Sequence, residues 1–313
     1  MKQIASFNSF AQMLEVLPDE KSCRNYLELL RWNNEPRCPH CGFKEHYVLK
    51  TKGEFKGMYK CKNCKERYTV TVGTMFEGSH VPLRKWFIAL WIFSSHKKGI
   101  SSHQLGRDLG LTQKSAWFIL HRIREAFTNS APELLGNIIE ADEMFYGGEN
   151  KNRHSNKKVK EAQGRSVKDK TPVFGMIERG GKLSTHVVTD TKAITLRPLI
   201  QQMIKEGSLV ITDEWVSYPS ATKGYPHLVV KHKEGQYVDG IAHTNTIENF
   251  WSLLSRGIYG IYHQVSPKHL QRYCEEFEYR FNERKISDKE RFDMTILQTD
   301  NMRLSYKKLV NKA

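Results

Sequence analysis

The stretch Asn137-Ile138-Ile139-Glu140-Ala141-Asp142-Glu143-Met144-Phe145 places three acids among apolar residues. Its length and its isoleucines predict a strand. Arg179-Gly180-Gly181-Lys182 has the composition of a hairpin turn. We therefore predict an α/β domain with a mixed sheet over 136–290. Its further strands are expected at 172–178, 183–188, 209–213 and 228–231, and its helices at 195–205, 246–256 and 267–283.

Three acids stand at the ends of these predicted elements. Asp142 ends the first strand, Asp213 ends a short apolar strand 71 residues later, and Glu248 opens a helix 35 residues after that. Carboxylates at the ends of neighbouring strands, with a third on a nearby helix, can surround hard divalent cations. Two such cations activate a nucleophile and stabilise the leaving oxygen in an in-line displacement at phosphorus. Asp142, Asp213 and Glu248 are therefore the candidate catalytic residues and the candidate Mg²⁺ or Mn²⁺ ligands.

Nearby acids compete for these roles, since a strand-end aspartate is often only a turn residue. The competitors are Glu140, Glu143 and Glu214. Strand alternation places Asp142 on the face of Glu140 and opposite Glu143.

The predicted helix at 246–256 is amphipathic. Glu248 lies beside its apolar stripe, and Arg256, two turns further on, is placed to hold a phosphate or a DNA strand. The stripe consists of Ile247, Phe250, Trp251, Leu254 and Ile258.

Four of the six cysteines form two CxxC pairs, Cys38 with Cys41 and Cys61 with Cys64. Each pair aims two thiolates at one ion, and two pairs close a tetrahedral zinc site. Strand-like segments at 47–50 and 57–60 lie between the pairs. We predict a zinc ribbon at 36–75 with these cysteines as Zn²⁺ ligands. The alternative is a redox CxxC, for which a second copy would be superfluous. The lone Cys23 and Cys274 are predicted to be buried small residues.

Residues 80–130 have the pattern of a helical DNA-binding region. An apolar helix over 83–93 precedes a short helix, a break at Gly110 and a second helix that Thr112 is placed to cap. This arrangement resembles a helix-turn-helix, with an ordinary helical hairpin as the alternative. The candidate DNA contacts on the second helix are Lys114, Arg122 and Arg124. Elsewhere we expect short helices at 1–35, a break at 128–133 and a tail at 291–313.

The chain is strongly basic, with 49 Lys and Arg against 34 Asp and Glu and a net charge of +15. This excess favours a polyanionic partner, because each cation placed on a phosphate releases condensed counterions. A basic surface kept for solubility is the alternative. Residues 150–170 hold eight Lys or Arg against two acids. We predict a mobile, phosphate-contacting loop there, with Lys157 and Lys158 as candidate contacts.

No apolar run is long enough to span a membrane, which takes about eighteen uncharged residues. The N-terminus MKQIASFNSF lacks a basic start followed by an apolar block. We therefore expect a cytoplasmic protein.

The most specific motif is His243-Thr244-Asn245-Thr246-Ile247-Glu248-Asn249-Phe250-Trp251-Ser252-Leu253-Leu254-Ser255-Arg256-Gly257. With the ribbon, FEGS at 76–79, EADEMFYGG at 140–148 and TDEW at 212–215, it resembles the IS1595-type insertion-sequence transposases with an ISXO2-like transposase domain. The resemblance covers almost the whole chain. It implies a bacterial, nucleoid-associated protein with an RNase H-like core and DDE chemistry dependent on Mg²⁺.

By the same resemblance, the substrates are double-stranded DNA, namely terminal inverted repeats and target DNA. Strands are cleaved and 3′-hydroxyl ends are joined to the target. Synapsis of two ends implies a homodimer or larger assembly. A different interpretation is a DNA-binding regulator with a non-catalytic core of transposase origin, against which the intact acids argue. A third is a nuclease without strand transfer, which the acids alone do not separate from a transposase.

The resemblance matches Asp142 and Asp213 to the first two catalytic acids of the family. The third place varies between Glu and Asn in the family, with a basic residue about two helical turns further on. Glu248 precedes Arg256 by eight residues and Asn249 precedes it by seven, while Ser255 stands where many relatives have Lys. We favour Glu248, because a carboxylate binds a divalent cation better than an amide does. Asn249 and Asn245 stay open as alternatives.

Overall fold

The computed structural model describes residues 7–127, 134–148, 150, 154–160, 166–231, 234–235, 238, 240–300 and 302–310. The chain divides into two compact units. The N-terminal unit comprises Met1–Asn129 and Glu283–Ala313, and the core unit comprises Ser130–Asn282. The break predicted at 128–133 lies outside the described residues.

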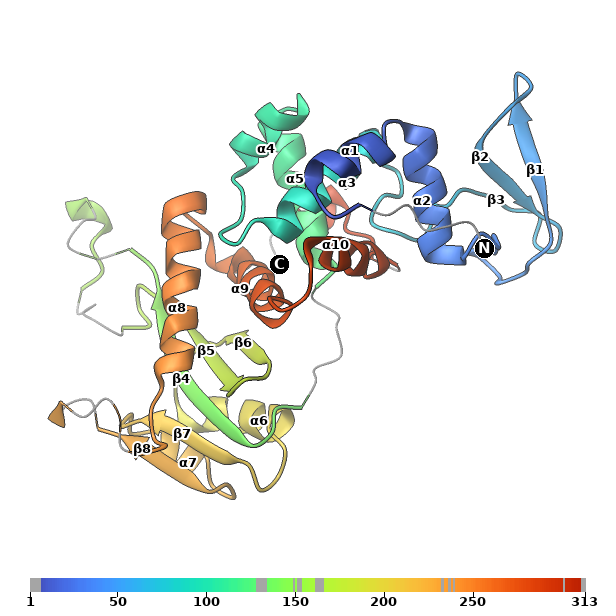
Figure 1. Cartoon of the computed structure of the whole chain (residues 1–313). Coiled ribbons are helices and arrows are strands. Elements are labelled where there is room, and N and C mark those ends of the chain that lie inside the picture. Colours follow the sequence, from blue (N-terminus) through green and yellow to red (C-terminus); the bar gives the residue numbers. More distant parts are fainter. Residues whose placement is uncertain are drawn as a thin grey trace. The chain divides into compact units, whose positions relative to one another are not determined.

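A five-stranded mixed sheet forms the centre of the core unit (Figure 1). The strands follow the order β6-β5-β4-β7-β8, in which β4, β5 and β6 are antiparallel neighbours and β7 and β8 run parallel to β4. The predicted α/β domain with a mixed sheet is confirmed, and each strand lies within one residue of its predicted ends. The bounds are β4 (Ile138–Tyr146), β5 (Thr171–Glu178), β6 (Leu183–Val187), β7 (Leu209–Asp213) and β8 (His227–Val230).

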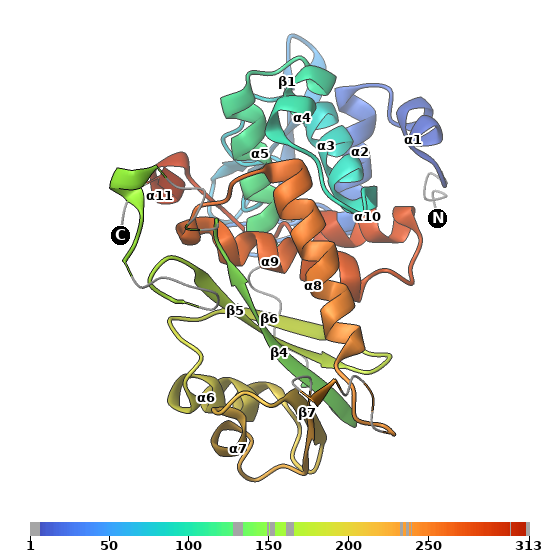
Figure 2. The ribbon, with the colours of Figure 1, turned by 90° about the vertical axis from the view of Figure 1, so that its left-hand side faces the viewer.

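Helices cover both faces of this sheet (Figure 2). On one face α6 (Ala193–Met203) and α7 (Tyr218–Ala221) bury a cluster that includes Ile139 and Ala141 of β4. On the other face α8 (Asn245–Gly257) and α9 (Pro267–Asn282) bury a cluster that includes Tyr146. The side chains of β4 therefore alternate between two cores. A π-helix (Ile258–Tyr262) extends α8, and a short 3₁₀ helix (Ser155–Lys157) follows β4.

Side chains of α9 close the outer edge of β6. Three backbone N–H groups of β6 donate to side-chain oxygens of α9 over 2.6–2.8 Å. An open strand edge would present these groups to other chains, so the helix protects this side of the sheet. The pairs are Leu183 with Asn282, Thr185 with Glu278, and Val187 with Gln271.

The ribbon of the N-terminal unit is a three-stranded antiparallel sheet of β1 (His46–Thr51), β2 (Glu54–Cys61) and β3 (Arg67–Tyr68). The predicted strands fall within β1 and β2, while the two-residue β3 was not predicted. Tyr59 and Tyr68 stack with ring centroids 5.4 Å apart, next to Cys38 and Cys61. The ribbon therefore has a small aromatic core beside its cysteines.

The rest of the N-terminal unit is helical. Ser101 caps α4, which ends at Gly110 in the left-handed conformation with φ 58°. Thr112 caps α5 by accepting from Ser115 N over 3.2 Å. The predicted break and cap are confirmed, and α4 and α5 form a helical hairpin. The helices are α1 (Phe10–Val16), α2 (Glu20–Trp32), α3 (Leu83–Ser95), α4 (Ser102–Leu109), α5 (Gln113–Glu125), α10 (Asp288–Leu297) and α11 (Tyr306–Val310).

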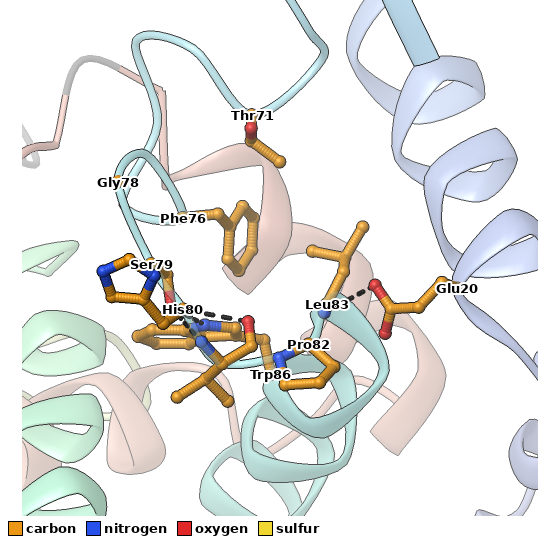
Figure 3. A pocket seen from close by; sticks show the side chains of 10 residues that line it. Glu20, Thr71, Phe76, Gly78, Ser79, His80, Pro82, Leu83 and Trp86 are labelled. Carbon is orange, nitrogen blue, oxygen red and sulfur yellow. Dashed lines mark hydrogen bonds between the residues drawn. The ribbon is translucent and has the colours of Figure 1, made fainter. Parts of the chain in front are cut away.

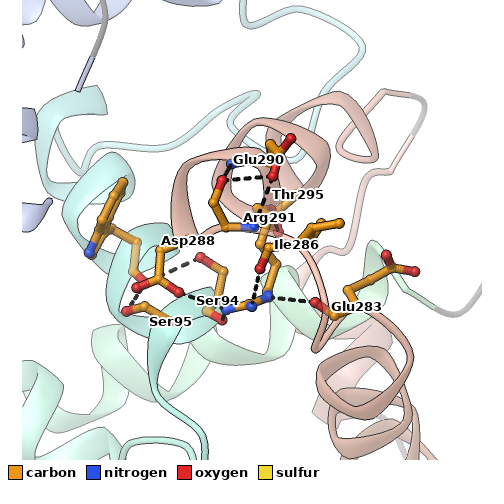
Figure 4. A network of polar contacts seen from close by, with 10 residues as sticks. Ser94, Ser95, Glu283, Ile286, Asp288, Glu290, Arg291 and Thr295 are labelled. Atoms are coloured by element: carbon orange, nitrogen blue, oxygen red, sulfur yellow. Dashed lines mark hydrogen bonds and ion pairs between the residues drawn. The ribbon is translucent and has the colours of Figure 1, made fainter. Parts of the chain in front are cut away.

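The C-terminal segment completes this unit instead of forming a separate tail. Phe292 of α10 packs its ring 5.9 Å from Phe7 and 5.5 Å from Trp91. Arg291 binds four acceptors, among them the Ser94 carbonyl at the end of α3, over 3.1 Å (Figure 4). The predicted boundary between 290 and 291 is therefore wrong, and the division falls between 282 and 283.

A cavity of about 360 Å³ lies beside the start of α3 (Figure 3). Glu20 lines it and accepts from the first two amides of α3, Leu83 N at 2.9 Å and Arg84 N at 2.8 Å. Ser79 accepts from the indole of Trp86 over 2.9 Å. These hydrogen bonds of the lining side chains hold the start of α3.

Candidate active site and metal centre

The four ribbon cysteines converge on one point. The Sγ atoms of Cys38 and Cys64 are 3.6 Å apart, as are those of Cys41 and Cys61, and all four lie within 4.8 Å of one another. A tetrahedral zinc site with Zn–S bonds of about 2.3 Å has sulfur atoms roughly 3.8 Å apart. The group therefore fits one Zn²⁺ ion, in agreement with the prediction.

The turn around Cys41 favours its thiolate. A hydrogen bond from the Phe43 backbone N–H is the main influence that lowers the pKa of the Cys41 thiol to about 6. Gly42 and Lys65 have φ of 74° and 64°, which lets the chain turn tightly around the sulfurs. Since zinc binds the thiolate form, the backbone at Cys41 favours metal binding by that residue, whereas burial raises the pKa of Cys38.

Asp142 and Asp213 occupy equivalent places on neighbouring parallel strands. The pairing of β4 with β7 runs from Ile138 opposite Leu209 to Glu140 opposite Ile211. Asp142 and Asp213 each follow the last pair by two residues, so they lie on the same face of the sheet. That face is the one covered by α8, because Ile139 and Ala141 point the other way, toward α6.

Asp213 and Asp142 also lie near one buried hydroxyl. Burial, followed by the negative charges of Glu143, Asp142 and Asp213, holds the pKa of Tyr218 well above its ordinary value. Asp213 is 8% exposed, and its Oδ1 accepts from Trp215 N over 2.9 Å. Carboxylates are thus concentrated at this end of the two strands.

Helix α8 runs along β4 in the same direction, as three contacts show. Thr246 N donates to Glu140 over 2.8 Å, and Trp251 Nε1 donates to Asp142 over 3.0 Å. Further on, Ser255 Oγ lies 3.8 Å from the sulfur of Met144. Successive positions on one strand face thus meet successive turns of the helix.

Glu248 lies in the first turn of α8, between the contacts to Glu140 and Asp142. Its side chain is exposed and accepts from Thr244 Oγ1 over 2.9 Å. Asn245 and Asn249 are exposed in the same turn, so burial does not separate the three alternatives. Among the described residues, the carboxylates of Asp142, Asp213 and Glu248 do not form a group as tight as the four cysteines.

Glu140, one of the competing acids, holds helix α8 on the sheet. Its carboxylate is 0% exposed and accepts from Thr246 N, Ile247 N and Thr246 Oγ1 over 2.8–3.1 Å. Arg179 Nε donates to it over 2.7 Å. A carboxylate so placed binds the N-terminus of α8, where the helix dipole favours negative charge.

The other two competing acids are placed differently from the candidates. Glu143 is buried on the opposite face of β4, beside Tyr218. Glu214 follows the end of β7 and is partly exposed.

The predicted DNA contacts separate into exposed and buried side chains. Lys114, Lys158 and Arg256 are exposed. Arg122 is 5% exposed and donates to the Glu77 carbonyl over 2.9 Å, while Arg124 is 0% exposed. A buried guanidinium does not reach a phosphate, so the prediction of DNA contact is wrong for these two arginines. The side chain of Lys157 lies outside the described residues, as do residues 151–153 and 161–165.

Two structural features of this region were missed in the sequence. Trp251 was assigned to the apolar stripe, although its indole N–H reaches Asp142. Its place three residues after Glu248, on the same side of a helix, was the available signal. The role of Glu140 in holding α8 had no local signal, because its partners are more than 100 residues away.

No helix in the described part of the chain is long and apolar enough to cross a membrane.

Comparisons with known proteins agree with this architecture. Residues 133–282 match the model of the ISXO2-like transposase domain, and residues 18–67 match that of the transposase zinc-ribbon domain. An uncharacterised protein of the transposable element ISH50 from Halobacterium salinarum is 29% identical over 280 residues, covering 85% of this chain and 92% of that protein. An uncharacterised transposase-like protein of Haemophilus influenzae is 29% identical over 106 residues, covering 34% of this chain and 85% of that protein.

Among solved structures, a chain of a simian T-cell lymphotropic virus intasome in complex with a PP2A regulatory subunit aligns at 12% identity and a TM-score of 0.28. The alignment covers 56% of this chain and 63% of that one. A score this low carries no argument about the fold. The two domain models and the ISH50 protein agree with the sequence motifs, and the chain belongs to the IS1595 family of transposases.

Proposed function

We propose that this transposase cleaves DNA strands at the terminal inverted repeats of its insertion sequence and joins the 3′-hydroxyl ends to target DNA. The observation that carries the proposal is the placement of Asp142 and Asp213 in equivalent positions of parallel strands, beneath the helix that bears Glu248. The strand order, with β4 central and β5 and β6 antiparallel to it, supports an RNase H-like interpretation of the core.

In this proposal the three carboxylates hold Mg²⁺ or Mn²⁺. Oxygen ligands of this kind suit hard cations, and two bound cations would activate the nucleophile and stabilise the leaving oxygen. Asp142 and Asp213 sit on rigid strands, which fixes their spacing. Glu248 sits on α8, which is held on the sheet by hydrogen bonds to Glu140. These bonds fix the position of Glu248 relative to the two aspartates.

DNA recognition is proposed for the N-terminal unit and for exposed cations of the core. The α4–α5 hairpin has the cap and glycine turn of a helix-turn-helix, with Lys114 exposed in the first turn of its second helix. Lys158 and Arg256 are exposed on the core unit. Synapsis of two DNA ends would require at least two copies of the chain.

The test is incubation of the zinc-loaded full chain with a labelled end of its own element, with Mg²⁺, Mn²⁺ or chelator. We expect metal-dependent 3′-hydroxyl ends that become joined to a second DNA. Asp213→Asn should lower cleavage by at least about a hundredfold, whereas the matched variant of the adjacent acid, Glu214→Gln, should retain it. Full cleavage by Asp213→Asn would refute the assignment of the site. Tight DNA binding without any cut by the wild type would favour a regulator, and cutting without joining would favour a nuclease.

A further inference from the structure

A tryptophan on α8 contacts a candidate catalytic carboxylate directly. Trp251 Nε1 donates to Asp142 Oδ2 over 3.0 Å. The indole is 7% exposed and packs 5.2 Å from the ring of Phe250 in the core between α8 and the sheet. Because packing fixes the ring, the direction of its N–H is fixed as well.

A glycine on the neighbouring strand makes this contact possible. Gly175 of β5 is the direct cross-strand partner of Asp142. A Cβ at Gly175 would lie 2.7 Å from two ring carbons of Trp251 and 3.0 Å from Ile247 Cδ1. Only a residue without a side chain lets the indole lie this close to the sheet and reach the carboxylate.

The helix that carries Trp251 is itself held in register with β4. Glu140 accepts from Thr246 N at 2.8 Å and Ile247 N at 3.1 Å, one turn before Trp251. Glu140 and Asp142 belong to the same face of the same strand. Hydrogen bonds to β4 therefore lie on both sides of the turn that contains Glu248.

We propose that Trp251 is a positioning residue that orients the Asp142 carboxylate for a divalent cation, with Gly175 providing the seat for its ring. The inference rests on the proposed function, because it assigns Asp142 as a metal ligand. A hydrogen-bond donor to a ligating carboxylate restricts its rotation, and removal of such a partner typically costs about 10- to 100-fold in metal affinity or activity.

The test measures Mn²⁺ binding to the zinc-loaded full chain by calorimetry, together with the Mn²⁺ concentration that gives half-maximal DNA cleavage. Trp251→Phe removes the donor and keeps most of the ring. The matched control is Tyr225→Phe, which removes a hydroxyl donor from the same unit. The hydrogen bond of this hydroxyl to the Ile204 carbonyl is also 3.0 Å long. We expect the Mn²⁺ dissociation constant and the half-maximal concentration to rise about tenfold in Trp251→Phe. Both should stay within about twofold of the wild type in the control.

Equal Mn²⁺ affinity and equal cleavage in Trp251→Phe and the wild type would overturn the positioning role and leave the proposed function intact. A wild-type chain that neither binds Mn²⁺ in the core nor cleaves DNA would overturn both.

A second measurement serves if Trp251→Phe does not fold. The wild type has six tryptophans, and each carries one indole N–H that a nitrogen-resolved NMR spectrum detects. Substoichiometric Mn²⁺ should broaden the Trp251 signal before that of Trp86, which is bonded to Ser79 in the other unit. Equal broadening of both signals would contradict the proposal.

Discussion

The cysteine site of the ribbon and the acidic site of the core differ in how the chain assembles them. Cys38 and Cys64, the outermost ligands of the ribbon, are 26 residues apart and lie in tight local turns. Asp142 and Glu248 are 106 residues apart, and the helix that bears Glu248 is connected to Asp142 only through packing on the sheet and the hydrogen bond of Trp251. We infer that the ribbon depends on its ion for its shape, whereas the acidic site depends on the packing and polar ties of the core.

Removal of zinc should have the strongest effect and should distinguish the two sites. Cys61→Ser should abolish zinc binding and unfold the ribbon, because structural zinc contributes about 10 kcal/mol or more of apparent binding free energy in small domains. Elemental analysis should show the loss of zinc, and thermal unfolding should show an unchanged transition for the core unit. Cys23→Ser, which alters a buried cysteine outside the group, should keep its zinc. Loss of core structure along with zinc would contradict the independence of the two sites.

The converse experiment breaks the acidic site and spares the ribbon. Glu140→Ala leaves Arg179 and the N-terminus of α8 without their carboxylate, and breaking a buried ion pair costs about 3–5 kcal/mol. Urea unfolding of the core should show this loss while zinc content stays unchanged. Glu178→Ala removes a hydrogen bond to Asn137 in an exposed setting, so it should cost under about 1 kcal/mol. An equally small loss in both variants would mean that Glu140 does not hold the helix.

A third prediction concerns the pH dependence of the core. Burial is the main cause that raises the pKa of Glu278 from its ordinary 4.5 to about 7. Between these values the folded state binds more protons than the unfolded state, so this residue's contribution to stability falls as pH rises from about 4.5 to 7. The total change in the free energy of unfolding is on the order of 3 kcal/mol.

Glu278→Gln should remove this pH dependence of stability, because an amide does not titrate. Its oxygen can still accept from Thr185 N and Oγ1, so the contact with β6 is kept. Urea unfolding at several pH values measures it. The exposed acid Asp108 is the matched control, and Asp108→Asn should keep the slope of the wild type. A slope that persists in Glu278→Gln would assign the titration to another group.

The weakest change is predicted for DNA affinity. Lys114→Ala should weaken binding to DNA by a few-fold and reduce the slope of log affinity against log salt by about 1, as expected for one lost phosphate contact. Lys205→Ala, an exposed lysine of the core, should leave both unchanged. A titration of labelled DNA at several salt concentrations distinguishes them, and identical slopes for both variants would remove Lys114 from the interface.

The same contrast explains what the sequence could predict. The ribbon ligands follow from spacing alone, and the strands of the core follow from short apolar runs and turn residues. Alternation along one strand correctly separated Asp142 from Glu143. The burial of Arg122 and Arg124 was not predictable, because a basic residue on an amphipathic helix faces inward only when distant segments cover it. The attachment of α10 to the N-terminal unit depends on contacts such as that of Arg291 with Ser94, which are about 200 residues apart.

The most direct test of Asp142 and Asp213 as metal ligands is to locate Mn²⁺ by anomalous scattering in crystals of the zinc-loaded chain. We expect a peak bound by carboxylate oxygens of both Asp142 and Asp213 at the shared end of β4 and β7, and no such peak in Asp142→Asn. Ordered Mn²⁺ elsewhere on the chain, or an unchanged peak in Asp142→Asn, would contradict the assignment of these acids as the metal-binding centre.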